Sequence, residues 1–212
     1  MNFTFLFDMD GTLVDTFDII YESFNKALAV NNKKTFTKQG FKQTLFGKPV
    51  DRETYRMLDI TDEKEVKKIM GDFQGFWFEN LPKVKIFKDV RLTLEELKER
   101  GSKLGVVSTS PRDVIKKTLE HAGVYDLFDV FVGEEDVENK KPHREPVCTA
   151  LNALSISPEQ TFFVGDTVYD LMAGKTAGCR TVLLLNGYNE EVMDIMKPDY
   201  MVQDIRELLE LS

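Results

Sequence analysis

Cysteine is scarce in this chain of 212 residues, in which only Cys148 and Cys179 occur. Two cysteines without metal-type spacing exclude a small disulfide scaffold and a cysteine-based metal motif, so we expect reduced thiols in a reducing compartment. Basic residues are also outnumbered: 28 Lys and Arg stand against 36 Asp and Glu, a formal net charge of −8. That balance disfavours a surface built to bind nucleic acid, although an acidic protein can still bind a small anion where it concentrates cations or a metal.

Long apolar runs are missing as well. No stretch approaches the length of a transmembrane helix, and Asp8 and Asp10 stand where a signal peptide would be apolar. We therefore expect a cytoplasmic protein that has no membrane partner. What is present is ordinary for a globular protein: 42% of the residues are apolar and 30% are charged, which is enough to bury a core without disulfides.

Short apolar runs, each typical of a buried strand, lie at 3–7, 104–107, 128–132, 161–164 and 181–185. Helical patterns separate them from about residue 88 onward. The patterns over 90–100 and 111–122 each end at a glycine, and the second begins with Ser110 as N-cap and Pro111 at the first helical position. Strand and helix in alternation predict a parallel sheet that is covered by helices on both faces.

The segment from residue 15 to residue 81 has a different pattern, with helical periodicity, many charges and no convincing strand. Apolar residues at helical spacing in 62–80 predict a helix whose aromatic side chains form the core of this segment. We therefore predict an α/β core domain made of residues 1–14 and 82–212, into which a helical domain of residues 15–81 is inserted.

Acidic residues follow two of the expected strands directly. Asp8, Asp10 and Gly11 come after the first strand, and two carboxylates followed by a turn-forming glycine could hold a divalent cation and present one oxygen as a nucleophile. Asp166 and Asp170 come after the fourth strand, with Asp166 as the cap of a helix that starts near residue 167. A plain turn and a plain helix cap are the structural alternatives at these two places.

The two acidic sites belong together if the sheet is parallel, because ligands bind at the carboxyl ends of parallel strands. The carboxylates of Asp8, Asp10, Asp166 and Asp170 would then converge on one edge of the sheet, where their like charges would raise one another's pKa. A Mg²⁺ ion relieves such repulsion and takes oxygen ligands. We therefore predict Mg²⁺ as the cofactor and these four residues as its candidate ligands.

Hydroxyl and lysine side chains follow two other strands. Ser108 and Thr109 come after the second strand, where a hydroxyl and backbone N–H groups suit a phosphate oxygen and helix capping is the alternative. Lys140 and Lys141 lie in the loop after the third strand, and Pro142 stiffens the loop behind Lys141. A lysine among carboxylates can neutralise a nucleophile and a phosphoryl group, so we favour Lys141 over the alternative of a solvated basic loop.

Taken in order, these residues resemble the haloacid dehalogenase superfamily of phosphatases. The matching residues run along nearly the whole chain and are Asp8-Met9-Asp10-Gly11-Thr12-Leu13-Val14-Asp15, Ser108, Lys141-Pro142, Gly165-Asp166 and Asp170. The helical insert directly after the first motif is similar to the cap of the phosphoglycolate phosphatase-like branch, which also includes β-phosphoglucomutase and pyrophosphatase-like members. The resemblance implies a Rossmann-like core with a mobile helical cap.

The resemblance also implies Mg²⁺-dependent phosphoryl transfer through an aspartyl-phosphate. Asp8 would attack phosphorus in line, and Asp10 would protonate the leaving alcohol and then activate water. Ser108 and Lys141 would hold the phosphoryl oxygens. Beside these residues, Gly11 and Thr109 are further candidates for contact with the phosphate.

For the metal, the resemblance implies that Asp166 binds Mg²⁺ together with Asp8 and the backbone carbonyl of Asp10. Asp170 would support either the metal site or Lys141. These implied roles suit phosphoryl transfer, which depends mainly on positioning of the reacting groups and on stabilisation of their charge.

Substrate choice is expected to depend on the cap, which closes over the phosphate and excludes water. Residues 45–52 resemble the loop of the family's cap that reaches the substrate. Lys48 or Arg52 would meet a second anionic group there, unless both are surface cations.

We expect a phosphatase of a small phosphorylated metabolite, with phosphoglycolate as the leading candidate, acting as a monomer or a homodimer. The alternatives are a pyrophosphatase, a sugar-phosphate phosphatase or mutase of the same superfamily, and an inactive phosphate-binding module. Asp10 disfavours a dehalogenase, since dehalogenases of the superfamily lack a carboxylate two residues after the nucleophile. Ile20 disfavours a mutase, because it stands near the place where that branch usually carries a histidine.

Overall fold

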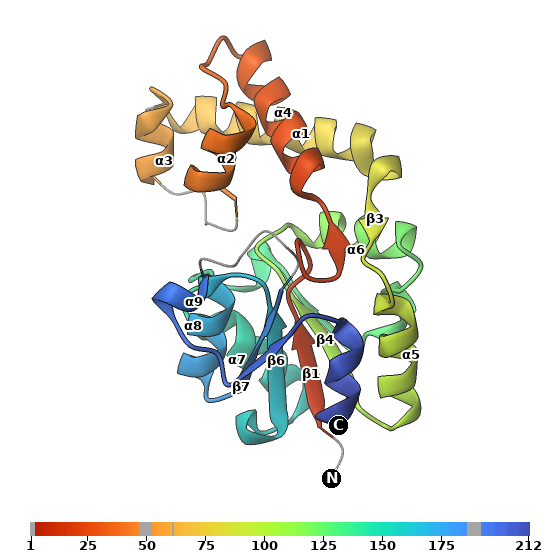
Figure 1. The fold of residues 1–212 in the computed structure, drawn as a ribbon. Coiled ribbons are helices and arrows are strands. Elements are labelled where there is room, and N and C mark those ends of the chain that lie inside the picture. Colours follow the sequence, from red (N-terminus) through yellow and green to blue (C-terminus); the bar gives the residue numbers. More distant parts are fainter. Residues whose placement is uncertain (1–2, 47–51, 61, 186–191) are drawn as a thin grey trace. The chain divides into compact units, whose positions relative to one another are not determined.

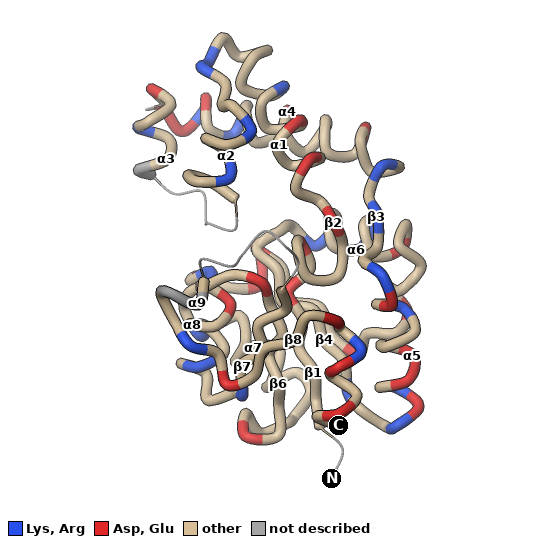
Figure 2. The backbone as a smooth tube through the Cα atoms, in the orientation of Figure 1, with Lys and Arg blue, Asp and Glu red and all other residues tan. Residues whose placement is uncertain are grey.

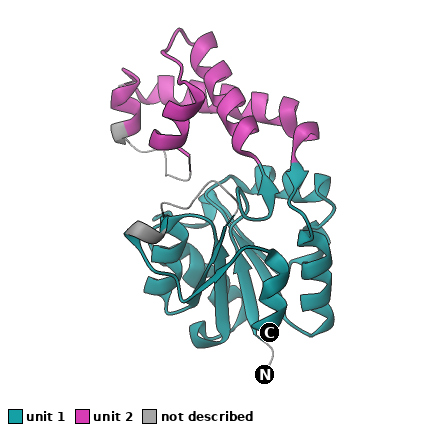
Figure 3. Ribbon diagram, in the orientation of Figure 1, with its two compact units in different colours: residues 1–15, 85–212 teal, residues 16–84 magenta. Residues whose placement is uncertain are grey.

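The structure, a computed structural model, describes residues 3–46, 52–60, 62–185 and 192–212 (Figure 1). Basic and acidic residues are interspersed along the chain (Figure 2). In the described part, no helix combines the length and the apolar character needed to cross a membrane. The chain divides into two compact units, one of residues 1–15 and 85–212 and the other of residues 16–84 (Figure 3).

The unit of residues 1–15 and 85–212 is built on a six-stranded parallel sheet. In spatial order its strands are β5 (Val130–Val132), β4 (Lys103–Val107), β1 (Thr4–Phe7), β6 (Thr161–Gly165), β7 (Arg180–Leu184) and β8 (Tyr200–Val202). The predicted Rossmann-like α/β fold is thus confirmed. The edge strand β8 was not predicted, because three residues, of which Tyr200 and Met201 are exposed, carry too little apolar pattern.

Helices cover both faces of this sheet. They are α5 (Val90–Glu99), α6 (Arg112–His121), α7 (Glu145–Leu154) and α8 (Val168–Ala177). The unit also contains the short helix α9 (Val192–Ile195) and 3₁₀ segments at Tyr125–Leu127, Glu134–Asp136, Pro158–Gln160 and Ile205–Glu210. Successive side chains of a strand point to opposite faces. On β1, Leu6 therefore joins the cluster with Val147 and Leu151 of α7, whereas Phe5 stacks on Phe162 with ring centroids 5.1 Å apart. Burial on both faces explains the unbroken apolar run of this strand.

Two helix starts differ from the prediction. α6 begins one residue later than expected, with Pro111 instead of Ser110 in the N-cap position and no side-chain cap. α8 is capped by Thr167, whose hydroxyl accepts a hydrogen bond from the backbone amide of Asp170, so Asp166 lies just outside the helix. In both places the N-cap lies one residue later than the sequence pattern predicted, so the loop between strand and helix is longer. The side chains of Ser110 and Asp166 therefore make other contacts.

Two short strands lie where the chain leaves this unit and returns to it. β2 (Val14–Asp15) and β3 (Lys85–Ile86) form an antiparallel pair, with Val14 opposite Ile86 and Asp15 opposite Lys85. They were not predicted, because two residues cannot show the alternation that marks a strand. The pairing holds the two ends of the insertion side by side.

The unit of residues 16–84 is helical. Its helices are α1 (Phe17–Val30), α2 (Lys38–Thr44), α3 (Arg52–Met57) and α4 (Glu63–Asn80), followed by the 3₁₀ segment Leu81–Lys83. Between α1 and α4, the ring of Phe24 lies edge-on to Phe73 at 5.7 Å between centroids, and Trp77 is buried. The prediction that aromatic side chains of this helix form the core of the insert is confirmed for Phe73, Phe76 and Trp77.

The two cysteines are free thiols. Burial is the main influence on Cys179 and, with smaller contributions from Cys148 and Glu159, raises the pKa of its thiol to about 12. Cys179 is therefore protonated at neutral pH, and it packs as a small apolar residue beside Leu151 and Ala173 in the core.

Candidate active site

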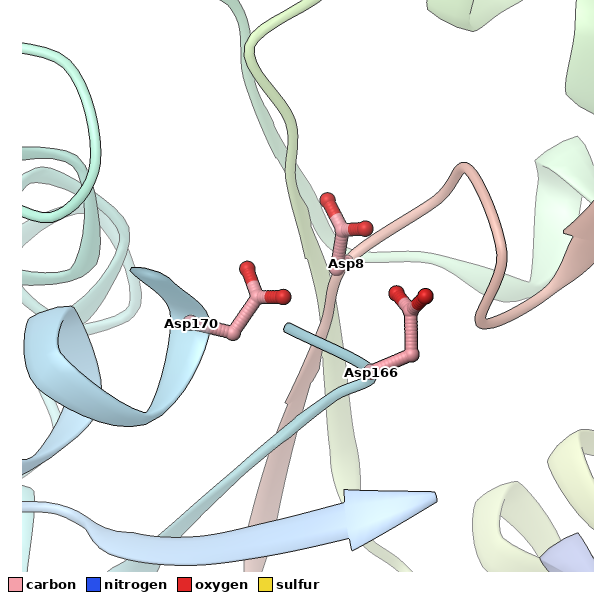
Figure 4. Close-up of side chains that lie close together, drawn as sticks. All are labelled: Asp8, Asp166 and Asp170. Atoms are coloured by element: carbon pink, nitrogen blue, oxygen red, sulfur yellow. The ribbon is translucent and has the colours of Figure 1, made fainter. Parts of the chain in front are cut away.

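Carboxylates from two neighbouring strands meet at one edge of the sheet. β1 and β6 pair with Phe7 opposite Val164, so the residues that follow the two strands emerge side by side. Asp8 follows β1 and donates its backbone amide to Val164 O at 2.9 Å, Asp166 follows β6, and Asp170 lies in the first turn of α8. Each of the three aspartates offers a carboxylate oxygen, and these three atoms lie within 4.8 Å of one another (Figure 4). All three residues are buried.

Lys141 is the cation of this cluster. Its Nζ lies 2.6 Å from Asp8 Oδ1 and 2.6 Å from Asp170 Oδ1, and it donates a third hydrogen bond to Val107 O at 3.2 Å. All three protons of the ammonium group therefore have acceptors, and the residue is 5% exposed. Lys140 is placed differently, since it pairs with Glu134 at the surface. Of the two adjacent lysines, the structure brings the favoured one into the site.

Charge and burial act on the two central groups in different ways. Burial is the largest influence on Asp8 and raises its pKa. Lys141 opposes this effect, whereas the neighbouring carboxylates add to it, so that the pKa of Asp8 lies well above the ordinary value for an aspartate. Burial alone would lower the pKa of Lys141, but the charges and hydrogen bonds of Asp170 and Asp8 outweigh it and raise that pKa. Lys141 is therefore a cation, and it faces more negative charge than it can balance.

Gly11 and Thr12 determine how Asp166 approaches the cluster. The Thr12 hydroxyl donates to Asp166 Oδ1 at 3.0 Å. Gly11 has a φ of +85°, and a Cβ added there would lie 2.5 Å from Asp166 Oδ2. A glycine is required both by this left-handed backbone and by the close carboxylate. From the sequence, Gly11 was expected only as a turn residue and a phosphate contact, and Thr12 had no role beyond the family motif.

Asp170 has both carboxylate oxygens engaged by the protein. Oδ1 accepts from Lys141, while Oδ2 accepts from the Thr167 backbone amide at 3.0 Å and from the Thr167 hydroxyl at 2.6 Å. Thr167 and Asp170 thus form a capping box at the start of α8. Of the two roles considered for Asp170, this geometry favours support of Lys141 over direct binding of a metal.

Asp10 adds to the negative charge around Asp8, although its carboxylate is not one of the three whose oxygens lie within 4.8 Å of one another in the described part of the chain. Its role as a metal ligand stays a prediction. Asp10 is half-buried, and the Ser110 hydroxyl donates to Asp10 Oδ2 at 3.1 Å. Ser108 is buried at the end of β4 and accepts from the Ser110 amide at 3.1 Å, whereas the neighbouring Thr109 is exposed.

The predicted substrate contacts of the insert belong to the other unit. Lys48 lies outside the described residues, and Arg52 is the first residue of α3. Both stay predictions. Ile20, the position at which a histidine was expected in a mutase, packs against the aromatic core of the helical unit.

Comparison with known proteins identifies the family of this chain. Residues 5–184 match the family model described as haloacid dehalogenase-like hydrolase. The chain belongs to this family. The resemblance found in the sequence is therefore confirmed, and the protein is an enzyme of the hydrolase class, as predicted.

Relatives of this haloacid dehalogenase-like hydrolase span nearly its whole length. It is 32% identical over 209 residues to pyrophosphatase PpaX of Bacillus mycoides (strain KBAB4), covering 97% of this chain and 94% of that protein. It is 33% identical over 209 residues to pyrophosphatase PpaX of Anoxybacillus flavithermus (strain DSM 21510 / WK1), covering 98% and 95%. The prediction of a phosphatase-type hydrolase of this superfamily is confirmed at this level.

Solved structures share the fold from end to end. A predicted phosphoglycolate phosphatase from Haemophilus somnus 129PT has a TM-score of 0.86 at 27% identity, covering 100% of this chain and 98% of that one. CbbY from Rhodobacter sphaeroides in complex with phosphate has a TM-score of 0.86 at 21% identity, covering 98% and 96%, which shows a common fold.

Proposed function

We propose that this hydrolase is a Mg²⁺-dependent phosphatase that acts on a small phosphorylated metabolite through an aspartyl-phosphate on Asp8. One observation carries the proposal: three buried carboxylates lie together at the carboxyl end of the parallel sheet, and two of them, Asp8 and Asp170, bind the buried Lys141. This is the edge at which α/β proteins bind ligands. The cluster combines a nucleophile, a fixed cation and unbalanced negative charge, which are the requirements of phosphoryl transfer.

The chemistry of the donor set suits Mg²⁺. The cluster offers oxygen ligands, which Mg²⁺ prefers, and its negative charge exceeds the single positive charge of Lys141. Asp8 and Asp166 would hold the ion, while Asp170, engaged by Lys141 and Thr167, would act through the lysine. When bound, Mg²⁺ would neutralise the carboxylates and the phosphoryl oxygens.

The other residues would move protons and hold the phosphate. As Asp8 forms its bond to phosphorus, the bond to the leaving oxygen breaks and Asp10 gives that oxygen its proton. In the second step Asp10 takes a proton from water, whose oxygen attacks phosphorus and releases Asp8 and phosphate. Lys141 and Ser108 would bind the phosphoryl oxygens throughout. Lys141 is already held beside Asp8, so little reorganisation is needed.

Two substrates have specific support. Phosphoglycolate is favoured by the solved neighbour that is 27% identical and bears that substrate in its name. Pyrophosphate is favoured by curated relatives that are 32% and 33% identical and are named pyrophosphatases. Both substrates carry an anionic group beyond the phosphoryl group that is transferred, which is the kind of group assigned to Lys48 or Arg52.

Release of inorganic phosphate from phosphoglycolate, pyrophosphate and a set of sugar phosphates tests this proposal. We expect turnover that requires Mg²⁺, is abolished by EDTA and is lost in Asp8→Asn. The matched control is Asp126→Asn, the same change at an exposed carboxylate of this unit, which should keep full activity. Phosphate binding without turnover would instead identify an inactive binding module, and turnover that survives in Asp8→Asn would overturn the role of Asp8.

A further inference from the structure

We propose that Ser110 is the residue that positions Asp10 for its proton transfers, an inference that rests on the proposed function. Ser110 lies between β4 and α6, where its sequence pattern predicted a helix cap. The side chain makes no cap in the structure. Its hydroxyl instead donates to Asp10 Oδ2 at 3.1 Å, a contact between residues 100 positions apart in the chain.

The backbone of Ser110 is fixed on both sides. Its amide donates to Ser108 Oγ at 3.1 Å, and its carbonyl accepts from the Glu134 amide at 3.1 Å. Gly133 packs so closely that a Cβ added there would lie 3.0 Å from the Ser110 carbonyl oxygen. A hydroxyl on a backbone held in this way loses little further freedom when it orients another group.

Arg112 connects the same turn to the loop after β5. Its Nε donates to Asp136 Oδ2 at 2.7 Å, and its amide donates to Glu135 Oε2 at 3.1 Å. Asp136 Oδ2 also accepts from the Gly133 amide at 2.8 Å. Ser110 thus belongs to a hydrogen-bond network that extends from Arg112 and Asp136 to Asp10.

Orientation of the Asp10 carboxylate matters because one group must serve two steps. Asp10 gives a proton to the leaving oxygen while the bond from Asp8 to phosphorus forms, and later takes a proton from the attacking water. A donor on Oδ2 fixes the rotation of the carboxylate and therefore the direction of its other oxygen. Ser110 keeps its own proton in both steps, so it acts as a positioning residue.

Two aryl phosphates with different leaving groups test this role. p-Nitrophenolate leaves without protonation, whereas phenolate needs a proton from the acid. We expect Ser110→Ala to lower kcat/KM about tenfold for phenyl phosphate but by less than about threefold for p-nitrophenyl phosphate. The loss should fall on kcat rather than KM. Ser110→Thr keeps a hydroxyl and should restore most of the activity toward phenyl phosphate.

Ser102→Ala is the matched control, because Ser102 is a buried serine at the opposite end of β4. It should leave the ratio of the two substrates unchanged. An equal loss of activity on both substrates with a raised KM would overturn the proposal, since it would mean that Ser110 contacts the substrate itself. Unchanged kinetics in Ser110→Ala would overturn it as well.

A crystal structure of Ser110→Ala provides a readout that needs no turnover. We expect the Asp10 carboxylate to rotate or to occupy more than one orientation. An Asp10 side chain that stays in place would overturn the positioning role even if the enzyme is an active phosphatase. Absence of phosphate release from wild type and Asp8→Asn alike would overturn the proposed function, and with it the role given to Ser110.

Discussion

Asp8 is the residue at which function and stability oppose each other. A nucleophile must present a charged oxygen to phosphorus, but this carboxylate is buried among other carboxylates, and its pKa is well above the ordinary value. The folded state binds the Asp8 proton more tightly than the unfolded state does. The contribution of Asp8 to stability is therefore complete at a pH below its pKa in the unfolded chain, and it is lost as the pH rises through its pKa in the folded protein. At neutral pH the ionised group therefore costs stability when no metal is bound.

This sign predicts the effect of Asp8→Asn on thermal stability. In EDTA at about pH 7 we expect the variant to melt roughly 2–4 °C above wild type, the shift that about 1 kcal/mol produces at this chain length. The difference should vanish near pH 4, where Asp8 is protonated. Differential scanning calorimetry measures both values, with Asp126→Asn as the exposed control. A lower melting temperature for metal-free Asp8→Asn at pH 7 would contradict the assignment of charge.

Lys141 should behave in the opposite way. Lys141→Met leaves Asp8 and Asp170 buried without their cation, so we expect a loss of about 3–5 kcal/mol in the free energy of unfolding, together with loss of turnover. The adjacent Lys140→Met removes an exposed ion pair with Glu134 and should cost less than about 1 kcal/mol. Urea unfolding followed by circular dichroism compares the two variants. Equal losses of unfolding free energy would mean that the buried ion pairs of Lys141 stabilise the fold no more than the exposed pair of Lys140 does.

The local sequence pattern explains which of the main helices and strands form, but not where every helix begins. The strands β1, β4 and β6 and the helices α5 to α8 follow from apolar runs, periodicity and terminal glycines, all of which act over a few residues. The starts of α6 and α8 do not, because Ser110 and Asp166 have capping side chains that the tertiary structure uses elsewhere. Ser110 binds Asp10 and Asp166 binds Thr12, and both partners are distant in the chain. These hydrogen bonds take the place of the predicted helix caps.

Two glycines of different elements predict opposite effects of one substitution. A Cβ on Gly71, in α4, meets nothing within 4 Å, so Gly71→Ala should stabilise the helical unit by about 0.5–1 kcal/mol. A Cβ on Gly105, in β4, would lie 2.6 Å from Leu6 Cδ2 and 2.6 Å from Val130 Cγ1, so Gly105→Ala should cost about 1–3 kcal/mol.

Denaturation separates these two effects. The fluorescence of Trp77, the sole tryptophan, reports the helical unit for Gly71→Ala, and circular dichroism reports the sheet for Gly105→Ala. A destabilised α4 in Gly71→Ala would contradict the first prediction, and an unchanged stability of Gly105→Ala would contradict the second.

For the whole molecule, an ion bound at the acidic cluster should couple to folding, because the cluster exists only when β1, β6 and α8 are assembled. A ligand at 100 times its dissociation constant stabilises by about 2.7 kcal/mol, so saturating Mg²⁺ should raise the melting temperature of wild type by roughly 5–10 °C. Removal of the ion with EDTA should reverse the shift. Asp166→Asn should reduce the shift strongly, whereas Asp126→Asn should retain it. An equal Mg²⁺ response in wild type and Asp166→Asn would exclude Asp166 as a ligand.

The class of fold and the alternation of the main strands and helices could be predicted from the sequence, whereas the short strands β2, β3 and β8 could not. Apolar periodicity and turn residues act locally, and residues 5–184 carry the family pattern in linear order. The choice of Lys141 over Lys140 was also available, because Pro142 marks the stiffer side of the loop.

Which side chains meet, and which oxygen each donor binds, depends on the assembled fold. It joined Asp8 and Asp170 through Lys141 and gave Asp10 a hydroxyl donor in Ser110. These contacts depend on strand register and join residues about 30 to 160 positions apart in the chain. The local sequence pattern does not distinguish between such distant partners, whereas hydrogen-bond geometry and burial in the folded protein do.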